Sequence, residues 1–365
     1  MFASTTGSFC AVVFPLFWRL IVFTFQLFRP KVKSFFGGLS SVAITLLGLL
    51  ALTFFIGRVM PIDPVLSVIG PDADNSTYEQ VYQEMGLDKP IYVQYLYYIN
   101  DLAHGDFGNA LLTGRPVIED IARVFPATLE LATVAIIFGI VIGIPLGVYA
   151  AVNKGRVIDH IIRVISLFGY STPVFWVGMI GLIIFYAWLN VVGGSGRVDL
   201  AYDGFVDPVT GMLLIDSALA KDWDVFQSAV KHIILPAFIL GLNAVSFITR
   251  MTRSFMLEQL SQEYILTAQV KGLPKHVVIW RHAFRNILVQ LLTIITLSYG
   301  SLLEGAVLIE TVFAWPGFGQ YLTSSLLLGD MNAVVASVLL IGLIFISMNL
   351  LTDLLYQVFD PRTRK

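Results

Sequence analysis

The 365-residue sequence has little charge and only one cysteine. Asp, Glu, Lys and Arg make up 13% of the residues, whereas apolar residues make up 56%. With Cys10 alone, the chain can form neither an internal disulfide nor a cysteine-rich metal site. A formal net charge of −2 gives no support to a nucleic-acid partner. This composition and a mean hydropathy of +0.79 place the chain among multispanning membrane proteins.

Motifs for catalysis and for nucleotide binding are missing as well. No GxxxxGK phosphate cradle is present, and the Gly-rich stretch at Gly193–Val198 has no predicted strand before it. The histidines never occur at metal-ligand spacing, and neither HExxH nor GxSxG is found. We therefore expect that this chain alone is not an enzyme and binds neither a cofactor nor a metal.

Long apolar runs predict an all-α membrane protein with six transmembrane helices. A helix needs about 20 apolar residues to cross the hydrocarbon core, because no backbone polar group can stay unpaired there. The predicted spans cover residues 35–59, 126–150, 162–189, 233–251, 287–309 and 332–356. The predicted regions are an amino-terminal extension (1–34), the first span with an external segment (35–125), a five-span domain (126–357) that contains the loop 253–286, and a cytoplasmic tail (358–365).

The basic residues predict the orientation of the chain. Connections on one predicted side carry 15 Lys and Arg residues, and the longer connections on the other side carry 7. Since basic loops stay in the cytoplasm, both termini are expected to lie inside. Residues 61–125 and 190–231 are then sizeable external segments, the second of them polar and irregular.

The first 34 residues allow two interpretations. Residues 10–28 are apolar except for Arg19, and a charge at mid-membrane costs about 2.5 to 3.5 kcal/mol. An additional helix lying at the inner surface is therefore favoured over a seventh span. The segment lacks a basic n-region and a small-residue cleavage site, so we do not predict a secretory signal peptide.

A basic segment lies between two apolar ones at residues 263–286, EYILTAQVKGLPKHVVIWRHAFRN. Glu263–Val270 is predicted to form a short helix that Gly272–Pro274 ends, and a second helix is predicted to start at Pro274. Ala268 and Gly272 are four residues apart, so we expect one face on which a partner can approach closely. The alternative is a solvated basic loop that only obeys the positive-inside rule.

The segment 248–286, which includes this stretch, reads ITRMTRSFMLEQLSQEYILTAQVKGLPKHVVIWRHAFRN. It resembles the cytoplasmic EAA-loop region of ABC-importer permeases of the dipeptide/oligopeptide subfamily. The resemblance covers roughly residues 35–364 and is to the dipeptide permease B type, whereas residues 1–34 have no counterpart in the family pattern. Matching blocks outside this loop are GLDKPIYVQYLYYINDLAHGDFG, RPVIEDIARVFPATLEL, GYSTPVFWVGM and ETVFAWPGFGQYL. The sequence departs from the family pattern at Leu266–Ala268, which replace the signature glutamate, at Gln290, where proline is frequent, and at Glu304, where a small residue is expected.

The resemblance implies a permease of type I ABC-importer architecture in the bacterial inner membrane. It would form half of the pathway of a binding-protein-dependent importer of dipeptides or oligopeptides. The implied partners are a second permease subunit, two ABC ATPase subunits that bind ATP and Mg, a periplasmic solute-binding protein and the lipid bilayer. Nickel chelates, glutathione and other small solutes are alternative substrates within the family.

Three groups of candidate functional residues follow. The resemblance implies a coupling helix that docks on an ATPase subunit, with Glu263, Tyr264, Thr267, Ala268, Lys271, Gly272 and Pro274. It also implies a gate or external loop with Glu310, Trp315, Pro316, Gly317, Phe318 and Gly319. Candidates for the translocation pathway are polar or kinking residues inside the predicted spans, namely Ser171, Thr172, Pro173, Asn243 and Glu304. For all of these except Glu304, helix packing is the alternative role. Glu304 and Glu310 would meet a peptide amino group or, alternatively, form interfacial salt bridges.

Two other functional classes stay open. A secondary transporter driven by an ion gradient would need no ATPase, but Pro145, Pro173 and Pro236 show no matched order of the kind that inverted repeats produce. A scaffold or receptor-like membrane protein would only dock partners. Copurification discriminates between them, because an importer permease should bring down a second permease and ATPase subunits.

Overall fold

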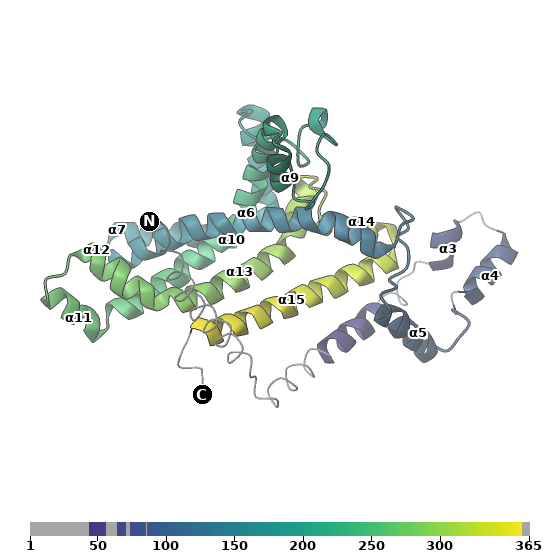
Figure 1. Cartoon of the computed structure of the whole chain (residues 1–365), viewed down its shortest axis with the longest axis horizontal. Helices are drawn as coiled ribbons and strands as arrows, with labels where there is room; N and C mark the ends of the chain where they lie inside the picture. Colours follow the sequence, from purple (N-terminus) through teal and green to yellow (C-terminus); the bar gives the residue numbers. More distant parts are fainter. Residues whose placement is uncertain (1–43, 56–63, 71–73, 85, 360–365) are drawn as a thin grey trace, which may run out of the picture. The chain divides into compact units, whose positions relative to one another are not determined.

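The computed structural model describes residues 44–55, 64–70, 74–84 and 86–359 (Figure 1). The predicted extension at 1–34, part of the first predicted span and the end of the tail lie outside the described residues. The chain divides into two compact units, Met1–Leu49 and Leu50–Lys365, and the features below belong to the second.

The regular elements in the described part of this unit are helices, joined by turns and loops, together with one isolated bridge between Asn109 and Pro116. Its elements are α3 (Pro64–Ile69), α4 (Asn75–Glu84), α5 (Ile91–Ala103), α6 (Val117–Val152), α7 (Val157–Ser171), α8 (Val174–Gly181), η1 (Leu182–Trp188), η2 (Leu200–Tyr202), α9 (Leu213–Ala220), α10 (Trp223–Leu260), α11 (Glu263–Val270), α12 (Lys275–Val277), η3 (Val278–Ala283), α13 (Phe284–Val312), α14 (Phe318–Leu328) and α15 (Met331–Phe359).

Four long helices match predicted spans. The stretches long and apolar enough to cross a membrane are Val117–Val152, Trp223–Leu260, Lys275–Val312 and Met331–Thr352. Pro145 and Pro236 lie inside α6 and α10, and neither helix ends at its proline. The predicted first span corresponds, in its described part, to the shorter apolar helix Ile44–Phe55. The number of six spans therefore stays a prediction.

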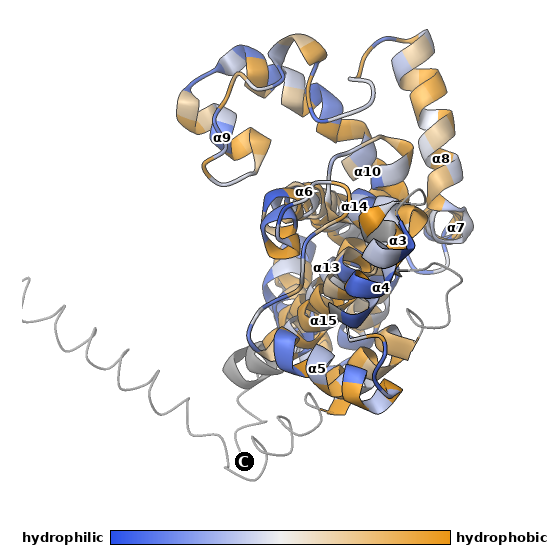
Figure 2. Cartoon of the chain, turned by 90° about the vertical axis from the view of Figure 1, so that its right-hand side faces the viewer, coloured by the Kyte–Doolittle hydropathy of each residue, from blue (hydrophilic) through white to orange (hydrophobic). Residues whose placement is uncertain are grey.

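The predicted third span, residues 162–189, is not one straight helix. α7 ends at Ser171, and α8 with η1 continues at an angle of 97° to it. Thr172 has an extended backbone because a residue before proline is disfavoured in the helical region, and Pro173 has no N–H to donate. Apolar residues cover much of α8 and η1 (Figure 2), and Trp176, Ile183 and Trp188 are among the exposed ones. Such a surface is stable in lipid or against another apolar surface.

Glycines allow the closest packing in the bundle, between α6 and α10. Gly139, Gly143 and Gly147 follow at four-residue intervals and face Ala244, Ile248 and Thr252. A Cβ on Gly147 would lie 2.6 Å from the Cβ of Thr252 and 2.7 Å from the backbone oxygen of Thr249. This row of small residues brings the two backbones together, as in other helix pairs in membranes.

We expect Gly147→Ala to weaken the contact between α6 and α10. The added methyl group has no space, and overpacking of this kind costs about 1 to 3 kcal/mol. The measurement is the apparent melting temperature of the purified protein in detergent. Gly305→Ala is the control, because its Cβ would meet only Leu240 Cδ1 at 3.8 Å. Equal melting temperatures for the two variants would contradict the packing argument.

The segment 190–231, which the sequence predicts to be external and which is called the external segment below for that reason, is more ordered than predicted. It contains η2 and α9, and α10 already begins at Trp223. Asp222 caps α10 by accepting a hydrogen bond of 3.2 Å from the backbone N–H of Val225. The prediction of an irregular loop is therefore wrong for a large part of this segment.

Candidate functional site

The short helix α11 forms where the sequence predicted it, and its end is defined by glycine. Gly272 has φ of +74°, and its N–H donates to Gln269 O at 2.9 Å. The next N–H, of Leu273, donates to Ala268 O at 3.3 Å. This pair of bonds is a Schellman motif, in which the left-handed residue favours glycine. Pro274 then precedes α12, so the predicted break and restart are confirmed.

The inner face of α11 packs against the same chain. Ile265 and Ala268 are buried in a cluster with Met256 near the end of α10, Ala283 at the end of η3 and Ile287 at the start of α13. The expectation that Ala268 shares an open face with Gly272 is therefore wrong. Ala268, only 6% exposed, is covered because η3 folds back over α11, whereas a Cβ on Gly272 would meet no atom within 4 Å.

Hydrogen bonds hold α11 on both sides. The hydroxyl of Tyr264 donates to Gln259 Oε1 at 2.9 Å and accepts from Asn286 Nδ2 at 3.0 Å. Gln259 belongs to α10 and Asn286 to α13, so Tyr264 joins both long helices to α11. Thr267 donates to Glu263 O at 3.1 Å within the helix. The helix is thus fixed in position relative to two of the long helices.

The outer face of α11 presents apolar side chains. Leu266 is 62% exposed and Val270 is 82% exposed, and four residues separate them on one side of the helix. Glu263, Lys271 and Lys275 are exposed around them. An exposed apolar pair on a rigid helix with a charged rim is suited to a partner with an apolar groove.

A buried ion pair lies at the same end of α10. Arg253 Nε and Nη2 donate to the two carboxylate oxygens of Asp159 at 2.7 and 2.9 Å. Asp159 also accepts from the backbone N–H of Gly155 at 3.0 Å, and Arg163 lies 3.7 Å from it. The pair ties the start of α7 to α10. From the sequence, Arg253 is only one of the basic residues of the predicted loop 253–286. Its pairing with Asp159 could not be predicted, because the two residues are 94 positions apart.

The predicted gate residues enclose the carboxylate of Glu310. Glu310 is completely buried, and it accepts hydrogen bonds from Thr128 Oγ1 at 2.5 Å and from the backbone N–H of Gln320 at 3.0 Å. A Cβ on Gly317 would lie 2.5 Å from its Oε1, and a Cβ on Gly319 would lie 2.6 Å from Val307 Cα. No salt bridge reaches Glu310 among the residues that the structure describes. Its donors are a hydroxyl and backbone amides.

Trp315 and its neighbours close the same turn. The indole N–H of Trp315 donates to Ala127 O at 3.1 Å, and the N–H of Phe318 donates to Thr128 Oγ1 at 2.8 Å. Pro316 is exposed at the tip of the turn. The structure brings these residues together in one turn, and its contacts with α6 were not predicted from the sequence.

The candidate pathway residues lie at a similar level of α10. Gly169, near the end of α7, faces Ser246 and Leu242, which lie on either side of Asn243. Ser171, Thr172 and Pro173 form the break that follows, and Gly305, next to Glu304, faces Leu240. Among the described residues, no hydrogen bond or ion pair joins these positions to one another. Asn243 Oδ1 is buried without a hydrogen-bond partner in that part of the chain.

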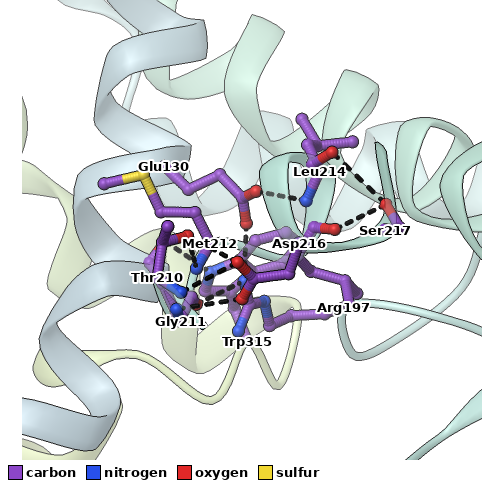
Figure 3. A network of polar contacts seen from close by, with 11 residues as sticks. Glu130, Arg197, Thr210, Gly211, Met212, Leu214, Asp216, Ser217 and Trp315 are labelled. Atoms are coloured by element: carbon purple, nitrogen blue, oxygen red, sulfur yellow. Dashed lines mark hydrogen bonds and ion pairs between the residues drawn. The ribbon is translucent and has the colours of Figure 1, made fainter. Parts of the chain in front are cut away.

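A polar network fixes the external segment to α6 (Figure 3). The carboxylate of Glu130 accepts from Arg197 Nη2 at 2.6 Å and from the N–H of Leu214 at 2.6 Å. Arg197 Nη2 also donates to Gly211 O at 3.0 Å, and its guanidinium lies 5.7 Å from the ring centre of Trp315. One arginine therefore connects α6, the external segment and the turn at Trp315.

Asp216 orders the second part of this network. Its carboxylate accepts from the N–H and Oγ1 of Thr210 at 2.8 and 2.7 Å and from the N–H of Gly211 at 2.9 Å. Burial acts to raise the pKa of Asp216, but these hydrogen bonds outweigh burial and lower the pKa below its ordinary value of 3.8. The charged form is therefore the one that stabilises the turn before α9.

We expect the stabilising effect of Asp216 to depend on pH. A carboxyl group with a lowered folded pKa stabilises the fold above its unfolded pKa, and this effect is lost as pH falls through the folded pKa. The wild-type protein should melt at a higher temperature than Asp216→Asn at about pH 7, and the difference should shrink toward about pH 3. Asp88→Asn, at an exposed position, should show no such convergence. If the difference in melting temperature between the wild type and Asp216→Asn does not change with pH, the charge of Asp216 does not stabilise the fold.

No group of three or more His, Cys, Asp or Glu side chains is placed to hold a metal ion within the residues that the structure describes.

Comparisons with known proteins identify relatives over most of the chain. The family model described as "Binding-protein-dependent transport system inner membrane component" matches residues 143–365, and the model described as "Binding-prot-dependent transport system membrane comp, N-term" matches residues 33–132. The dipeptide transport system permease protein DppB of Escherichia coli (strain K12) is 43% identical over 89% of this chain and 97% of its own length.

Two further relatives show similar sequence identity and coverage. The probable D,D-dipeptide transport system permease protein DdpB of Escherichia coli (strain K12) is 41% identical over 88% of this chain and 94% of its own length. The di/tripeptide transport system permease protein DppB of Pseudomonas aeruginosa (strain UCBPP-PA14) is 42% identical over 88% of this chain and 95% of its own length. A solved structure of the MetNI methionine ABC transporter in inward-facing conformations is 19% identical, with a TM-score of 0.46, and covers 65% of this chain and 97% of its own.

Proposed function

The chain belongs to the family of inner-membrane components of binding-protein-dependent transport systems, and from this premise we propose that it forms half of the pathway of an ATP-driven importer of dipeptides or short peptides. The substrate is proposed because the permease relatives at 41% to 43% identity transport dipeptides or di- and tripeptides by their names. The family membership places the chain in a bacterial inner membrane as a transport subunit, not an enzyme.

The outer face of α11 supports the proposed coupling to ATPase subunits most directly. The chain has no phosphate cradle of its own, so the energy of ATP must reach it through a contact with another subunit. Leu266 and Val270 offer an apolar contact on a helix that Tyr264 fixes to α10 and α13. A rigid-body movement of an ATPase subunit would then move the long helices directly. Ala268 contributes by packing α11 onto the chain.

The proposed partners are a second permease subunit, two ATPase subunits that carry ATP and Mg, and a periplasmic solute-binding protein. The proposed orientation places both termini and α11 in the cytoplasm, on the basis of the basic loops. The division into regions at residues 34, 125 and 357 and the interfacial helix at 1–34 stay part of this proposal.

Copurification and transport test the proposed function together. The tagged chain should bring down a second permease and two ATPase subunits. The complex in proteoliposomes should take up a dipeptide only with internal ATP and an external binding protein. Uptake that follows an ion gradient without ATP would instead support a secondary transporter.

We propose that Glu304 lines the pathway. It lies inside the membrane-spanning stretch Lys275–Val312, it is exposed, and it has no hydrogen bond or ion pair with the described residues. A charge at such depth costs about 2.5 to 3.5 kcal/mol if it faces lipid. The exposed face of α13 around it also carries Ser301 and Gly305. Exposed Leu297 and Leu308 flank this polar patch on the same face. A polar patch between apolar residues fits an aqueous pathway shared with a second permease.

Glu304→Gln should reduce uptake of peptides with an additional positive charge more than uptake of neutral or acidic peptides. A carboxylate in a partly dehydrated pathway attracts cations, and losing about 1 to 1.4 kcal/mol of that attraction lowers uptake about five- to tenfold. The measurement is the ratio of the uptake rate of a lysine-containing dipeptide to that of a glutamate-containing dipeptide at the same concentration. Ser301→Ala is the control on the same face. An unchanged ratio would remove Glu304 from the pathway.

A further inference from the structure

A pocket lies between the external segment and the turn at Trp315. Its volume is about 360 Å³, and residues 195–216 form most of its wall. Arg197, Leu200, Tyr202 and Asp203 line it from the segment, and Ala314 and Pro316 line it from the turn. This volume is large enough for one or two bulky side chains or a short stretch of extended backbone.

The wall of the pocket is preformed. Gly196 N–H donates to Phe313 O at 2.9 Å, and Gly193 N–H donates to Lys231 O at 2.8 Å. The pair of Arg197 and Glu130 fixes the same segment to α6 (Figure 3). A preformed pocket loses little conformational entropy when a partner binds. Arg197 Nε is buried without a partner among the described residues, so the wall retains one unused donor.

The rim around the pocket carries negative charge. Residues 195–224 contain six aspartates against Arg197 and Lys221, which gives a net charge of −4. Arg197 is neutralised by Glu130, and Asp216 is buried with its donors, so neither contributes to the surface. Asp203, Asp207 and Asp224 are exposed. A partner with a basic face would be attracted here.

Large apolar side chains stand between these aspartates. Leu200 is 94% exposed, and Phe205 and Val209 are also mostly exposed. Within this short segment they alternate with Asp203 and Asp207, a mixture that suits a protein surface better than a lipid surface. Anionic lipid headgroups would also be repelled by the aspartates.

We infer that this pocket and its rim, residues 195–209 with the turn 314–316, form the docking site of the solute-binding protein, which inserts an apolar side chain flanked by basic residues. The inference rests on the proposed function, since the family depends on a binding protein and the segment is external in the proposed orientation. It is called the acidic docking pocket below. The adjacent turn encloses Glu310, so docking occurs beside the predicted gate.

The test uses the full complex in lipid nanodiscs and the purified binding protein that stimulates ATP hydrolysis by the wild-type complex. Asp203→Lys with Asp207→Lys should raise the apparent Kd of the binding protein at least about tenfold, because attraction is replaced by repulsion. Leu200→Glu should raise it through loss of the apolar contact. Raising the salt concentration should weaken binding to the wild type and strengthen binding to the lysine variant.

Asp88→Lys is the matched control, because Asp88 is an exposed aspartate in the other predicted external segment and is not part of the pocket. It should bind as the wild type does. Unchanged affinity in both Asp203→Lys/Asp207→Lys and Leu200→Glu would overturn the docking site while the wild-type complex still responds to its binding protein. If no binding protein stimulates the wild-type complex, the proposed function itself fails.

Discussion

Replacing Leu266 and Val270 together by aspartate is expected to lower ATP-driven uptake by about 100-fold or more, because burying two carboxylates against an apolar groove should cost at least about 3 kcal/mol in total. Both side chains are exposed, so their loss leaves the cluster around Ile265 and Ala268 intact. The variant should reach the membrane in normal amounts. Copurification of the ATPase subunits and uptake in proteoliposomes are the two measurements.

Leu219→Asp is the control for this change. Leu219 in α9 is as exposed as Leu266, at 62%, but it belongs to the external segment. The same charge on an equally exposed leucine should leave ATPase copurification at the wild-type level. If the double variant of α11 still retains its ATPase subunits and transports normally, α11 is a solvated loop helix and the coupling proposal is wrong.

Asp159→Asn should destabilise the protein by about 3 kcal/mol, since it leaves the guanidinium of Arg253 without its counter-charge. This is the lower end of the range for buried pairs, because Arg253 keeps some exposure to solvent. α7 should then detach from α10 at the end that carries α11, so uptake should fall together with stability. The apparent melting temperature and ATP-driven uptake measure the two effects.

A double variant separates the ion pair from simple packing. Adding Arg253→Met to Asp159→Asn removes the uncompensated charge, so the double variant should melt at a higher temperature than the single one. Glu258 is an exposed acid near the same end of α10, so Glu258→Gln should change neither the melting temperature nor the uptake. Additive losses from the two substitutions would mean that the ion pair contributes nothing of its own.

Local signals predicted the features that depend on neighbouring residues. Gly272 and Pro274 determine the end of α11 and the start of α12, because φ of +74° and the missing proline N–H are properties of single residues. The long helices likewise follow from apolar length. The break after α11 could be predicted within a few residues, whereas α6 and α10 extend well beyond the apolar spans that predicted them.

Contacts between distant segments could not be predicted in this way. Glu310 accepts from Thr128, 182 positions away, and Glu130 accepts from Arg197, 67 positions away. Ala268 is inside because η3 folds back over it, which an eight-residue helix does not reveal. Proline had different effects at similar apolar sites: Pro173 accompanies a 97° bend, whereas Pro145 and Pro236 lie inside unbroken helices. Tertiary packing decides between these outcomes.

The continuity of α10 has a mechanical consequence. Its 38 residues form one helix from Trp223 to Leu260, immediately before α11. Near its start, Ser228 donates to Asp199 in the segment that forms the acidic docking pocket. At 1.5 Å per residue this rod is about 57 Å long, so a tilt of about 5° at one end displaces the other by about 5 Å. No intermediate element has to relay the motion. Displacement produced inside by the ATPase subunits would reach the external pocket through a single lever.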